Sequence, residues 1–364
     1  MPEEHAQRRN RLATAAVAAG ADAALITRLV NVRYLTGLAS SNAALLIHAD
    51  GRAVLATDGR YYTAAVAVAP DVEVVKERSV VATLAARAAS DGVHRLGVEE
   101  HDVTLATAGV IHKAAETAEL VHLDRAVEKL RAVKEEQELA LIRQACGISS
   151  EALVDLWAGG RLLGRTEKAV ARELEWRMYE HGADGVAFET IVASGPHSGV
   201  PHHRPTDRTI RRGDLLKIDF GASFRGYQAD CTRTSVVGAE PDGWQQEIYD
   251  LVATAQRAGR EALVVGAECV TVDHAAREVI EAAGYGQHFG HGTGHGIGLE
   301  VHEAPTIGYS APGTLGDRMP VTVEPGIYLP GRGGVRIEDT LVVREAERPE
   351  LLTNTTKDLL VLDA

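Results

Sequence analysis

The stretch LLKIDFGASFRGYQADCTRT, residues 215–234, places two aspartates inside segments that otherwise look like buried strands. Its pattern predicts a β-hairpin with a turn at residues 223–226. A turn at that point pairs Asp219 with Asp230 across the two strands. We therefore expect both carboxylates on one face of the sheet, with their Cβ atoms about 5 Å apart.

The predicted aspartate pair poses an electrostatic problem, because two like charges in a partly buried site repel each other. A shared proton or a cation would neutralise them, and a pair of divalent ions about 3.5–4 Å apart fits two such carboxylates well. The alternative is an exposed hairpin end with two solvated aspartates. This stretch alone does not decide between the two.

The bulk composition excludes several classes of protein. A chain of 364 residues is long enough for two domains with a large core. Apolar residues make up 45% and charged residues 24%, as in ordinary globular proteins. The net charge of -13 argues against nucleic acid as a partner, because such binders need a basic face. No run of 18 apolar residues occurs, so we expect no membrane span and no membrane partner.

The N-terminus combines three arginines with the alanine-rich run LATAAVAAGADAAL, which faintly resembles a signal peptide. The acids Glu3, Glu4 and Asp22 instead favour an amphipathic helix that ends at Gly20 and is followed by the strand AALIT. We therefore expect a cytoplasmic protein. The three cysteines form no CxxC pair, so a disulfide framework is not expected, and Cys231 is interpreted as a small core residue.

The chain is predicted to fold as two domains joined by a short linker. Residues 1–125 alternate helical and strand patterns, as in a compact α/β domain. Residues 126–134 form a charged helical linker, and residues 135–364 form the second domain. The clearest expected elements of the first domain are strands at 44–48, 53–57 and 72–76 and a helix at 80–90.

The second domain contains a weak internal repeat. AREL at 171–174 and AREV at 276–279 are separated by 105 residues, as are KIDFG at 217–221 and TVEPG at 322–326. In the second pair, an acid occupies the same point of a strand that is followed by glycine. The shared offset favours a duplication that gives two equivalent halves, each of which donates acids to a common centre.

Residues 288–305, HFGHGTGHGIGLEVHEAP, alternate glycine with other residues in a pattern typical of neither helix nor ordinary strand. The glycines allow a close backbone approach to a site or another chain. The spacing does not fit a phosphate-binding loop. A single histidine here would be read as structural, but His291, His295 and His302 together indicate a functional site.

Two further acids, Glu324 and Glu338, are flanked by apolar residues, and a hairpin through residues 330–334 would bring them together. The alternative is that Arg336 simply neutralises Glu338, which leaves Glu324 unexplained. Four carboxylates with an imidazole suit Mn²⁺, Co²⁺ or Zn²⁺. The pattern therefore favours a two-metal hydrolase, in which the metals activate water and polarise a carbonyl.

Several motifs together resemble the pita-bread metallopeptidases, a family that includes aminopeptidase P, prolidase and methionine aminopeptidase. The resemblance covers essentially the whole chain and implies a mixed α/β (α+β) fold, with a creatinase-like N-terminal α/β domain followed by a pseudo-twofold pita-bread catalytic domain. The matching motifs are KIDFGASFRGYQADCTRT, HGTGHGIGLEVHEAP, VTVEPGIYLPG, GVRIEDT, SGPHSGVPHHRPT at 194–206 and NVRYLTGL at 31–38.

The resemblance implies a dinuclear site for two divalent ions per chain, with Mn²⁺ as the first choice and Co²⁺ or Zn²⁺ as alternatives. Glu324 would also take the proton of the attacking water, His302 would stabilise the intermediate, and His202, with His203 as a rival, would line the pocket. The implied metal ligands are Asp219, Asp230, His295, Glu324 and Glu338. The implied catalytic residues are Glu324, His302 and His202. The implied substrate-binding residues are His202, His291, His302 and Arg336. Arg336 would either neutralise a substrate carboxylate or brace Asp219.

The function implied by the resemblance is hydrolysis of an Xaa-Pro bond, either at the N-terminus of short proline-containing peptides or in dipeptides. The N-terminal domain implies a homodimer. Two alternatives keep the fold: a creatinase-like hydrolase or lyase that acts on another small molecule, and a non-catalytic binding protein. Relatives of both kinds have usually lost metal ligands, so the intact ligand set counts against them.

Overall fold

The protein is described by a computed structural model that covers residues 2–345 and 348–362. The chain divides into two compact units, one ending at Arg131 and the other beginning at Ala132. This division falls within the predicted linker, residues 126–134, most of which forms helix α6 (Ala126–Ala132). The domain limits of 125 and 135 stay predictions. None of the helices in the described part of the chain has the length and apolar surface that crossing a bilayer requires.

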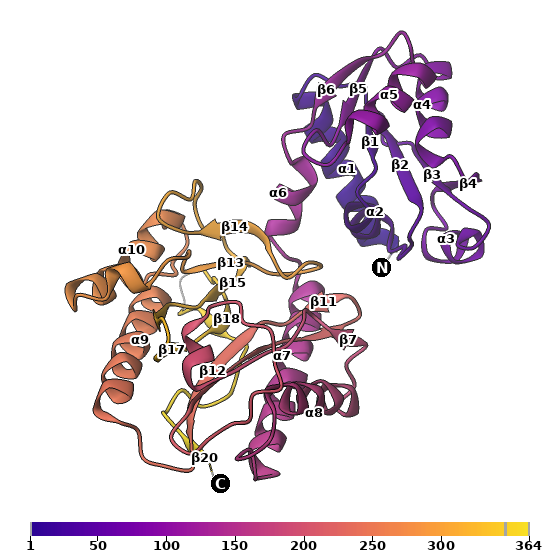
Figure 1. Ribbon diagram of the computed structural model, residues 1–364. Coiled ribbons are helices and arrows are strands. Elements are labelled where there is room, and N and C mark those ends of the chain that lie inside the picture. Colours follow the sequence, from indigo (N-terminus) through magenta and orange to yellow (C-terminus); the bar gives the residue numbers. More distant parts are fainter. Residues whose placement is uncertain (1, 346–347, 363–364) are drawn as a thin grey trace. The chain divides into compact units, whose positions relative to one another are not determined.

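The N-terminal unit is a mixed sheet with the strand order β4-β3-β2-β1-β5-β6 (Figure 1). The predicted strands at 44–48, 53–57 and 72–76 and the helix at 80–90 are confirmed, because their alternating apolar residues form the core beneath the helices. The strands are β1 (Ala23–Ile26), β2 (Ala43–His48), β3 (Ala53–Thr57), β4 (Glu73–Lys76), β5 (Arg95–Val98) and β6 (Glu119–His122). The helices are α1 (Pro2–Ala18), α2 (Leu29–Thr36), α3 (Tyr62–Val68), α4 (Val80–Ser90) and α5 (Leu105–Ala114).

The alanine-rich N-terminal segment is the amphipathic helix that its sequence predicts. Leu12 and Ala16 on α1 are buried, whereas Val17 is exposed. The chain then turns at Gly20, whose φ of 82° is in the left-handed region that glycine adopts without strain. The predicted strand follows as β1.

The C-terminal unit packs two pairs of helices around antiparallel strands, with α7 beside α8 and α9 beside α10 (Figure 1). Buried apolar clusters fill the space between the helices and the strands. The helices are α7 (Glu136–Ala158), α8 (Glu167–Glu180), α9 (Gly243–Glu261) and α10 (Cys269–Ala282), with short 3-10 turns η1 (Gly195–Gly199) and η2 (Gly286–His288).

The strands of this unit form separate sheets with the orders β20-β12-β9-β8, β14-β13-β15-β18-β19, β11-β10-β7 and β16-β17. Cys231 is buried in the core beside the first sheet, as predicted, and all three cysteines are free. The strands are β7 (Gly185–Val186), β8 (Ile191–Ser194), β9 (Leu215–Phe220), β10 (Ala222–Phe224), β11 (Tyr227–Gln228), β12 (Cys231–Val237), β13 (Gly294–Gly296), β14 (Glu303–Ile307), β15 (Pro320–Val323), β16 (Gly326–Leu329), β17 (Gly333–Arg336), β18 (Asp339–Val342), β19 (Glu350–Leu351) and β20 (Val361–Leu362).

The internal repeat corresponds to matching elements in the two halves of this unit. Strands β9 and β15 begin at Leu215 and Pro320, which are 105 residues apart, and each leads into an acid of the predicted site. The AREL and AREV segments lie in α8 and α10, which are the second helix of each pair. The same order of helix pair and strand therefore appears twice, in agreement with the predicted duplication.

The register of the first hairpin differs from the prediction by one residue. Strand β9 pairs with β12 so that Asp219 faces Thr232, not Asp230. The turn is centred between Arg225 and Gly226, whose φ angles of 48° and 82° are both positive, as in a type I′ turn. When the centre of the turn moves by one residue, the residue opposite each position changes by two. Because side chains alternate between the two faces of a strand, a change of two leaves each side chain on the same face of the sheet. The predicted direct opposition was therefore wrong, but the shared face was right.

The second predicted hairpin is present, with its turn between β16 and β17. The same antiparallel register continues from this strand pair into β15 and β18 and places Glu324 opposite Glu338 at the break between the two ladders. At this break the backbone N–H of Glu324 donates to Thr293, and that of Glu338 donates to Thr232. Glu324 and Glu338 therefore lie at a gap in the pairing of this hairpin, where the backbone of each bonds to a neighbouring segment instead of to the other.

The alternating glycines permit close backbone contacts, as predicted. A Cβ atom on Gly294 would lie 2.0 Å from the carbonyl oxygen of Thr322, and one on Gly296 would lie 2.2 Å from that of Ala304. Any side chain at these positions would push β13 away from its neighbours. The strand that carries His295 can therefore approach the centre of the unit only because glycine flanks the histidine on both sides.

Candidate metal centre

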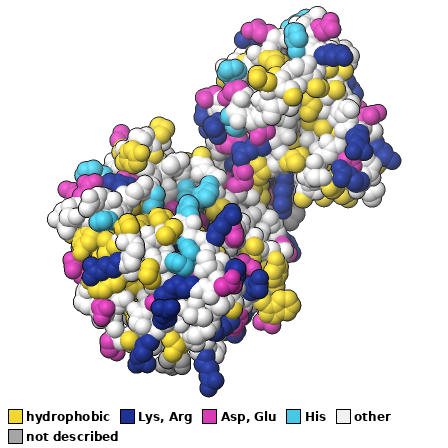
Figure 2. All heavy atoms as spheres, in the orientation of Figure 1, with side chains coloured by type: hydrophobic (Ala, Val, Ile, Leu, Met, Phe, Trp, Pro, Cys, Tyr) yellow, Lys and Arg dark blue, Asp and Glu magenta, His cyan; other side chains and the backbone are white. Residues whose placement is uncertain are grey.

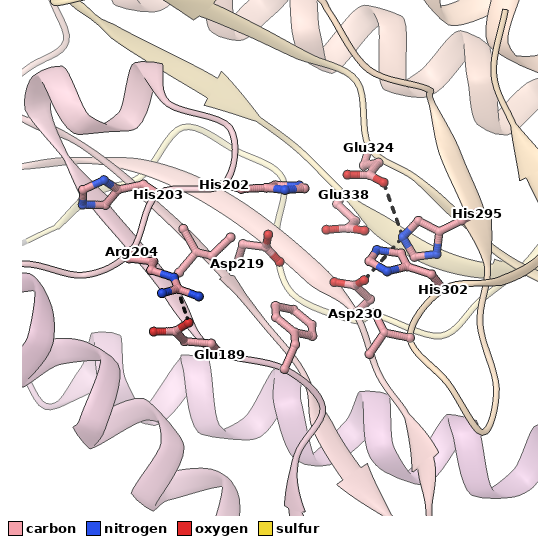
Figure 3. Close-up of a pocket in the computed structure, with 13 residues that line it drawn as sticks. Glu189, His202, His203, Arg204, Asp219, Asp230, His295, His302, Glu324 and Glu338 are labelled. Atoms are coloured by element: carbon pink, nitrogen blue, oxygen red, sulfur yellow. Dashed lines mark ion pairs between the residues drawn. The ribbon is translucent and has the colours of Figure 1, made fainter. Parts of the chain in front are cut away.

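A cavity of about 240 Å³ opens into the C-terminal unit (Figure 3). Since water occupies about 30 Å³ per molecule, the cavity admits a small ligand and not a folded partner. Its wall combines carboxylates and histidines with a few apolar side chains. The lining residues are Phe188, Glu189, Ile191, His202, His203, Arg204, Asp219, Asp230, His295, Val301, His302, Glu324 and Glu338.

All five predicted metal ligands line this cavity, although they lie on or next to five separate strands. One ligand lies on β9, one precedes β12, one lies on β13, one follows β15 and one precedes β18. The two hairpin registers place Asp219 near Asp230 and Glu324 near Glu338, and the backbone hydrogen bond from Glu338 to Thr232 joins these two hairpins across more than 100 positions of the sequence. In the order of those strands, the residues are Asp219, Asp230, His295, Glu324 and Glu338.

The distances within the cluster are those of groups that can share a cation. Nε2 of His295 lies 3.5 Å from Oε1 of Glu324 and 3.6 Å from Oδ2 of Asp230. Ligand atoms of Asp230, His295 and Glu338 all lie within 4.8 Å of one another. Figure 3 shows these side chains pointing toward one another from opposite walls.

The negative charges of the carboxylates repel one another. Burial, together with the charges of Glu338 and Asp219, raises the pKa of Asp230 well above its usual range. Burial and the charge of Glu324 do the same for the pKa of Glu338. Burial also raises the pKa of Glu324 to about 8, although Arg336 opposes the shift. Such shifts mark negative charge that the protein itself does not fully compensate.

The donor set fits a divalent cation. Oδ1 of Asp219 and Oε1 of Glu338 are buried and, within the described residues, accept no hydrogen bond. Buried polar atoms are normally paired, so these oxygens require another partner. Burial and His302 lower the pKa of His295 to about 4, which keeps its imidazole neutral and able to bind a metal. Hard oxygen donors with one nitrogen suit divalent ions such as Mn²⁺, Co²⁺ or Zn²⁺.

A buried arginine supports the cluster from behind. The guanidinium of Arg336 pairs with Oδ2 of Asp219, and its Nε lies 3.9 Å from Oε2 of Glu324. The same Nε donates to Thr232 Oγ1 at 3.0 Å, and that hydroxyl donates to Glu338 at 2.7 Å. Arg336 is 1% exposed and does not line the cavity. This geometry corresponds to bracing Asp219 and not to the simple ion pair with Glu338.

The predicted histidines occupy different positions. His302 and His202 are exposed and line the cavity, and the ring of His302 lies edge-on to that of His295, with centroids 4.4 Å apart. Figure 2 shows histidine side chains gathered on one face of the C-terminal unit. His291 is not brought to the cavity wall; its Nε2 is hydrogen-bonded to Tyr328 at 2.9 Å. Substrate contact by His291 and Arg336 stays a prediction.

Sequence reasoning missed Glu167, a fully buried acid on α8. Its oxygens accept hydrogen bonds from the backbone and hydroxyl of Ser194 and Thr206 and from the rings of His197 and His203. Burial opposes its charge, but these bonds outweigh burial and lower the pKa of Glu167 to about 2. Because both oxygens are already satisfied, this trio of acid and histidines is a structural anchor for residues 194–206 and not a second metal site.

Lys217, on β9, is a second buried support that the sequence did not reveal. Its ammonium donates to the carbonyls of Ser198, Val200 and Pro201. Burial and the nearby Arg336 lower the pKa of Lys217 well below its usual value. Lys217 and Glu167 therefore hold different points of the loop that carries His202. A lysine in an apolar strand two residues before Asp219 was the available signal.

Comparison with known proteins agrees with this centre. Residues 140–345 match the model of metallopeptidase family M24, and residues 8–133 match the creatinase/prolidase N-terminal domain. The chain belongs to metallopeptidase family M24. The predicted fold, a creatinase-like domain followed by a pita-bread catalytic domain, is thereby confirmed.

Several known proteins resemble the chain over nearly its full length. An uncharacterized peptidase, YqhT, of Bacillus subtilis is 40% identical over 344 residues, which cover 94% of this chain and 96% of that protein. The structure of an Xaa-Pro dipeptidase from Bacillus anthracis matches with a TM-score of 0.94 and 37% identity, covering 98% of this chain and all of the other. An X-Pro aminopeptidase from Thermotoga maritima matches with a TM-score of 0.87 and 36% identity, covering 96% and 100%.

Proposed function

We propose that this M24 protein hydrolyses the bond between an N-terminal residue and a following proline, in dipeptides or at the start of short peptides. The observation that carries the proposal is the convergence of four carboxylates and His295 on one small cavity, with buried oxygens that find no donor in the described protein. We further propose two divalent ions per chain, with Mn²⁺ as the first choice and Co²⁺ or Zn²⁺ as alternatives. A homodimer and a cytoplasmic location stay predictions.

All five residues are proposed to bind the cations, and one of them is also proposed to transfer a proton. Asp219, Asp230, His295, Glu324 and Glu338 would hold the ions, which when bound polarise a carbonyl and acidify an attacking water. Glu324 is the proposed proton acceptor because its side chain is 16% exposed and reaches the open part of the cavity. Arg336 pairs with Asp219 and orients its carboxylate for the proposed ligand role.

The proposed roles of the two exposed histidines follow from their positions. His302 lies against the His295 ring on the open side of the cavity, where its N–H can donate to the oxygen that becomes negative during attack on the carbonyl. His202 lies on the loop whose backbone Glu167 and Lys217 hold, and its imidazole lines the cavity, where it can meet the substrate. Burial and Arg336 lower the pKa of His202, which favours a neutral ring.

The proposed substrate fits the chemistry of the cavity. A free N-terminal amine is attracted by the carboxylates, and the apolar side chains of Phe188, Ile191 and Val301 offer surface to a proline ring. The imide nitrogen of proline carries no hydrogen, so a site for Xaa-Pro bonds needs no acceptor for an N–H. The names of the similar structures from Bacillus anthracis and Thermotoga maritima support the same substrate class.

The test is a comparison of Xaa-Pro dipeptides with Xaa-Pro-Yaa peptides, using purified protein with added Mn²⁺ and analysis of the released products. Free proline from dipeptides alone would identify a dipeptidase, and cleavage of the longer peptides would identify an aminopeptidase. A chelator is expected to abolish either activity, and Mn²⁺ or Co²⁺ to restore it. If neither substrate is cut under these conditions, the proposal is wrong and another small-molecule reaction on this fold becomes the better hypothesis.

A further inference from the structure

One end of the cavity carries a pair of opposite charges that the reaction itself does not use. Nε of Arg204 lies 3.3 Å from Oε2 of Glu189, and both side chains line the cavity. Figure 3 shows this pair at the end away from Glu324 and His295. Among the lining residues, all within the described chain, Arg204 is the one lysine or arginine. The cavity is therefore acidic at one end and carries a guanidinium at the other.

The backbone near Arg204 is held in place, whereas its side chain is largely exposed. His203, on one side of it, is hydrogen-bonded through Nε2 to buried Glu167 at 2.9 Å. Thr206, on the other side, donates to the same carboxylate through its N–H and its hydroxyl at 3.0 and 2.7 Å. The Arg204 side chain is nevertheless 85% exposed and that of Glu189 64% exposed. An ion pair this exposed contributes little to folding, so stability does not explain the arginine.

We propose that Arg204 binds the C-terminal carboxylate of a dipeptide substrate and thereby makes the site selective for Xaa-Pro dipeptides; this inference rests on the proposed function. A dipeptide is a zwitterion whose ammonium group is drawn to the four carboxylates and whose carboxylate is drawn to the guanidinium. The substrate carboxylate replaces Glu189 and can accept two parallel hydrogen bonds from Arg204. A longer peptide presents a neutral amide at this point and loses that interaction.

The test uses substrates that differ only in the C-terminal charge: an Xaa-Pro dipeptide and the same compound with a C-terminal amide. For Arg204→Gln we expect KM for the dipeptide to rise about tenfold, because a hydrogen-bonded charge pair is lost. We expect KM for the amide to stay unchanged, and kcat to change little for both substrates, because Arg204 does not contact the reacting bond. The preference of the enzyme for the dipeptide should therefore fall about tenfold.

Two companion variants complete the design. Glu189→Gln frees Arg204 from its resting partner, so KM for the dipeptide should fall or stay level and never rise. Arg212→Gln removes an exposed arginine that does not line the cavity, and both KM values should stay unchanged. Circular dichroism and thermal unfolding of each variant check that the fold is intact, as expected for exposed side chains.

The outcomes separate the inference from the function on which it rests. An active enzyme in which Arg204→Gln alters both KM values equally, or neither, overturns the role of Arg204 and leaves Xaa-Pro hydrolysis standing. The same holds if the wild-type enzyme prefers the amide. A wild-type enzyme with added Mn²⁺ that cuts no Xaa-Pro substrate overturns the proposed function and this inference with it.

Discussion

At the scale of single residues, Glu324 is more exposed than the other acids of the centre, with Asp219 and Asp230 at 10% and 7% side-chain exposure. Its side chain is 16% exposed, whereas Glu338 is 1% exposed and bonded to Thr232. Its backbone is fixed because its N–H donates to Thr293 at 2.7 Å and Pro325 follows it. A carboxylate that is both fixed and accessible suits proton transfer better than a fully enclosed one.

The corresponding prediction concerns Glu324→Gln. The amide keeps the size of the side chain but cannot accept the proton of an attacking water, so we expect kcat to fall by roughly 10²–10⁴ while the fold is retained. Steady-state kinetics with metal analysis and circular dichroism would measure this. Glu240→Gln, at an exposed position, is the control and should be fully active. Undiminished turnover in Glu324→Gln would remove Glu324 from the mechanism.

At the scale of elements, the short strand β13 shows how backbone packing supports the chemistry. Gly294 and Gly296 lie against carbonyl oxygens of neighbouring segments, with no space for a Cβ atom. The backbone N–H of His295 donates to Thr322 Oγ1 at 3.1 Å. The position of this histidine is therefore determined by how closely β13 approaches β15.

Replacing Gly294 with alanine tests this dependence. The new methyl group would lie 2.0 Å from the carbonyl oxygen of Thr322, so β13 must shift. We expect a loss of roughly 1–3 kcal/mol in the free energy of unfolding, together with weaker metal binding. Chemical denaturation and metal titration would measure the two effects. Gly290→Ala is a matched control, because Gly290 is exposed and a Cβ atom there meets nothing within 4 Å; equal effects in both variants would refute the explanation.

The hairpins show where sequence reasoning succeeds and where it ends. An acid inside an apolar strand is visible in the sequence, so Asp219, Asp230 and Glu324 could be predicted as candidates. An error of one residue in the turn centre shifts the strand pairing by two residues, so the face of the sheet on which a side chain lies was still predicted correctly. The register of the first hairpin could not be predicted, because it depends on Arg225 adopting a positive φ of 48°, which is rare for arginine. The anchoring of residues 194–206 was also hidden, since Glu167 belongs to a helix whose sequence looks ordinary.

At the scale of the whole molecule, repulsion among the acids of the metal centre lowers the stability of the folded chain. Four carboxylates converge near one buried guanidinium, and the raised pKa values of Asp230, Glu324 and Glu338 show that the metal-free chain holds these acids together at a cost in stability. The antiparallel strands nevertheless force the acids together, because the same strands form the core of the unit. Bound cations would relieve this repulsion, so folding and metal binding should be coupled.

This coupling predicts a pH dependence whose sign follows from Glu324. Its pKa is about 8 in the folded chain and ordinarily 4.5, so between these pH values the folded state keeps a proton that the unfolded state has released. The stability of the chelated protein should therefore fall as the pH rises from about 5 to 8. Metal binding, which requires deprotonated ligands, should strengthen over the same interval. Mn²⁺ at 100 times its Kd would add about 2.7 kcal/mol, or roughly 5–10 °C in Tm.

Asp230→Asn separates this explanation from a general effect of pH or salt. Removing one buried charge should raise the Tm of the chelated protein at pH 8, because the repulsion is smaller, and should abolish most of the gain on adding Mn²⁺, because a ligand is lost. Asp250→Asn, at an exposed position, should behave like the unaltered protein. Thermal unfolding at several pH values, with chelator and with Mn²⁺, measures all of these effects. A chelated protein whose stability rises between pH 5 and 8, or an Asp230→Asn variant with an undiminished response to Mn²⁺, would contradict the idea that these carboxylates are held together for a metal.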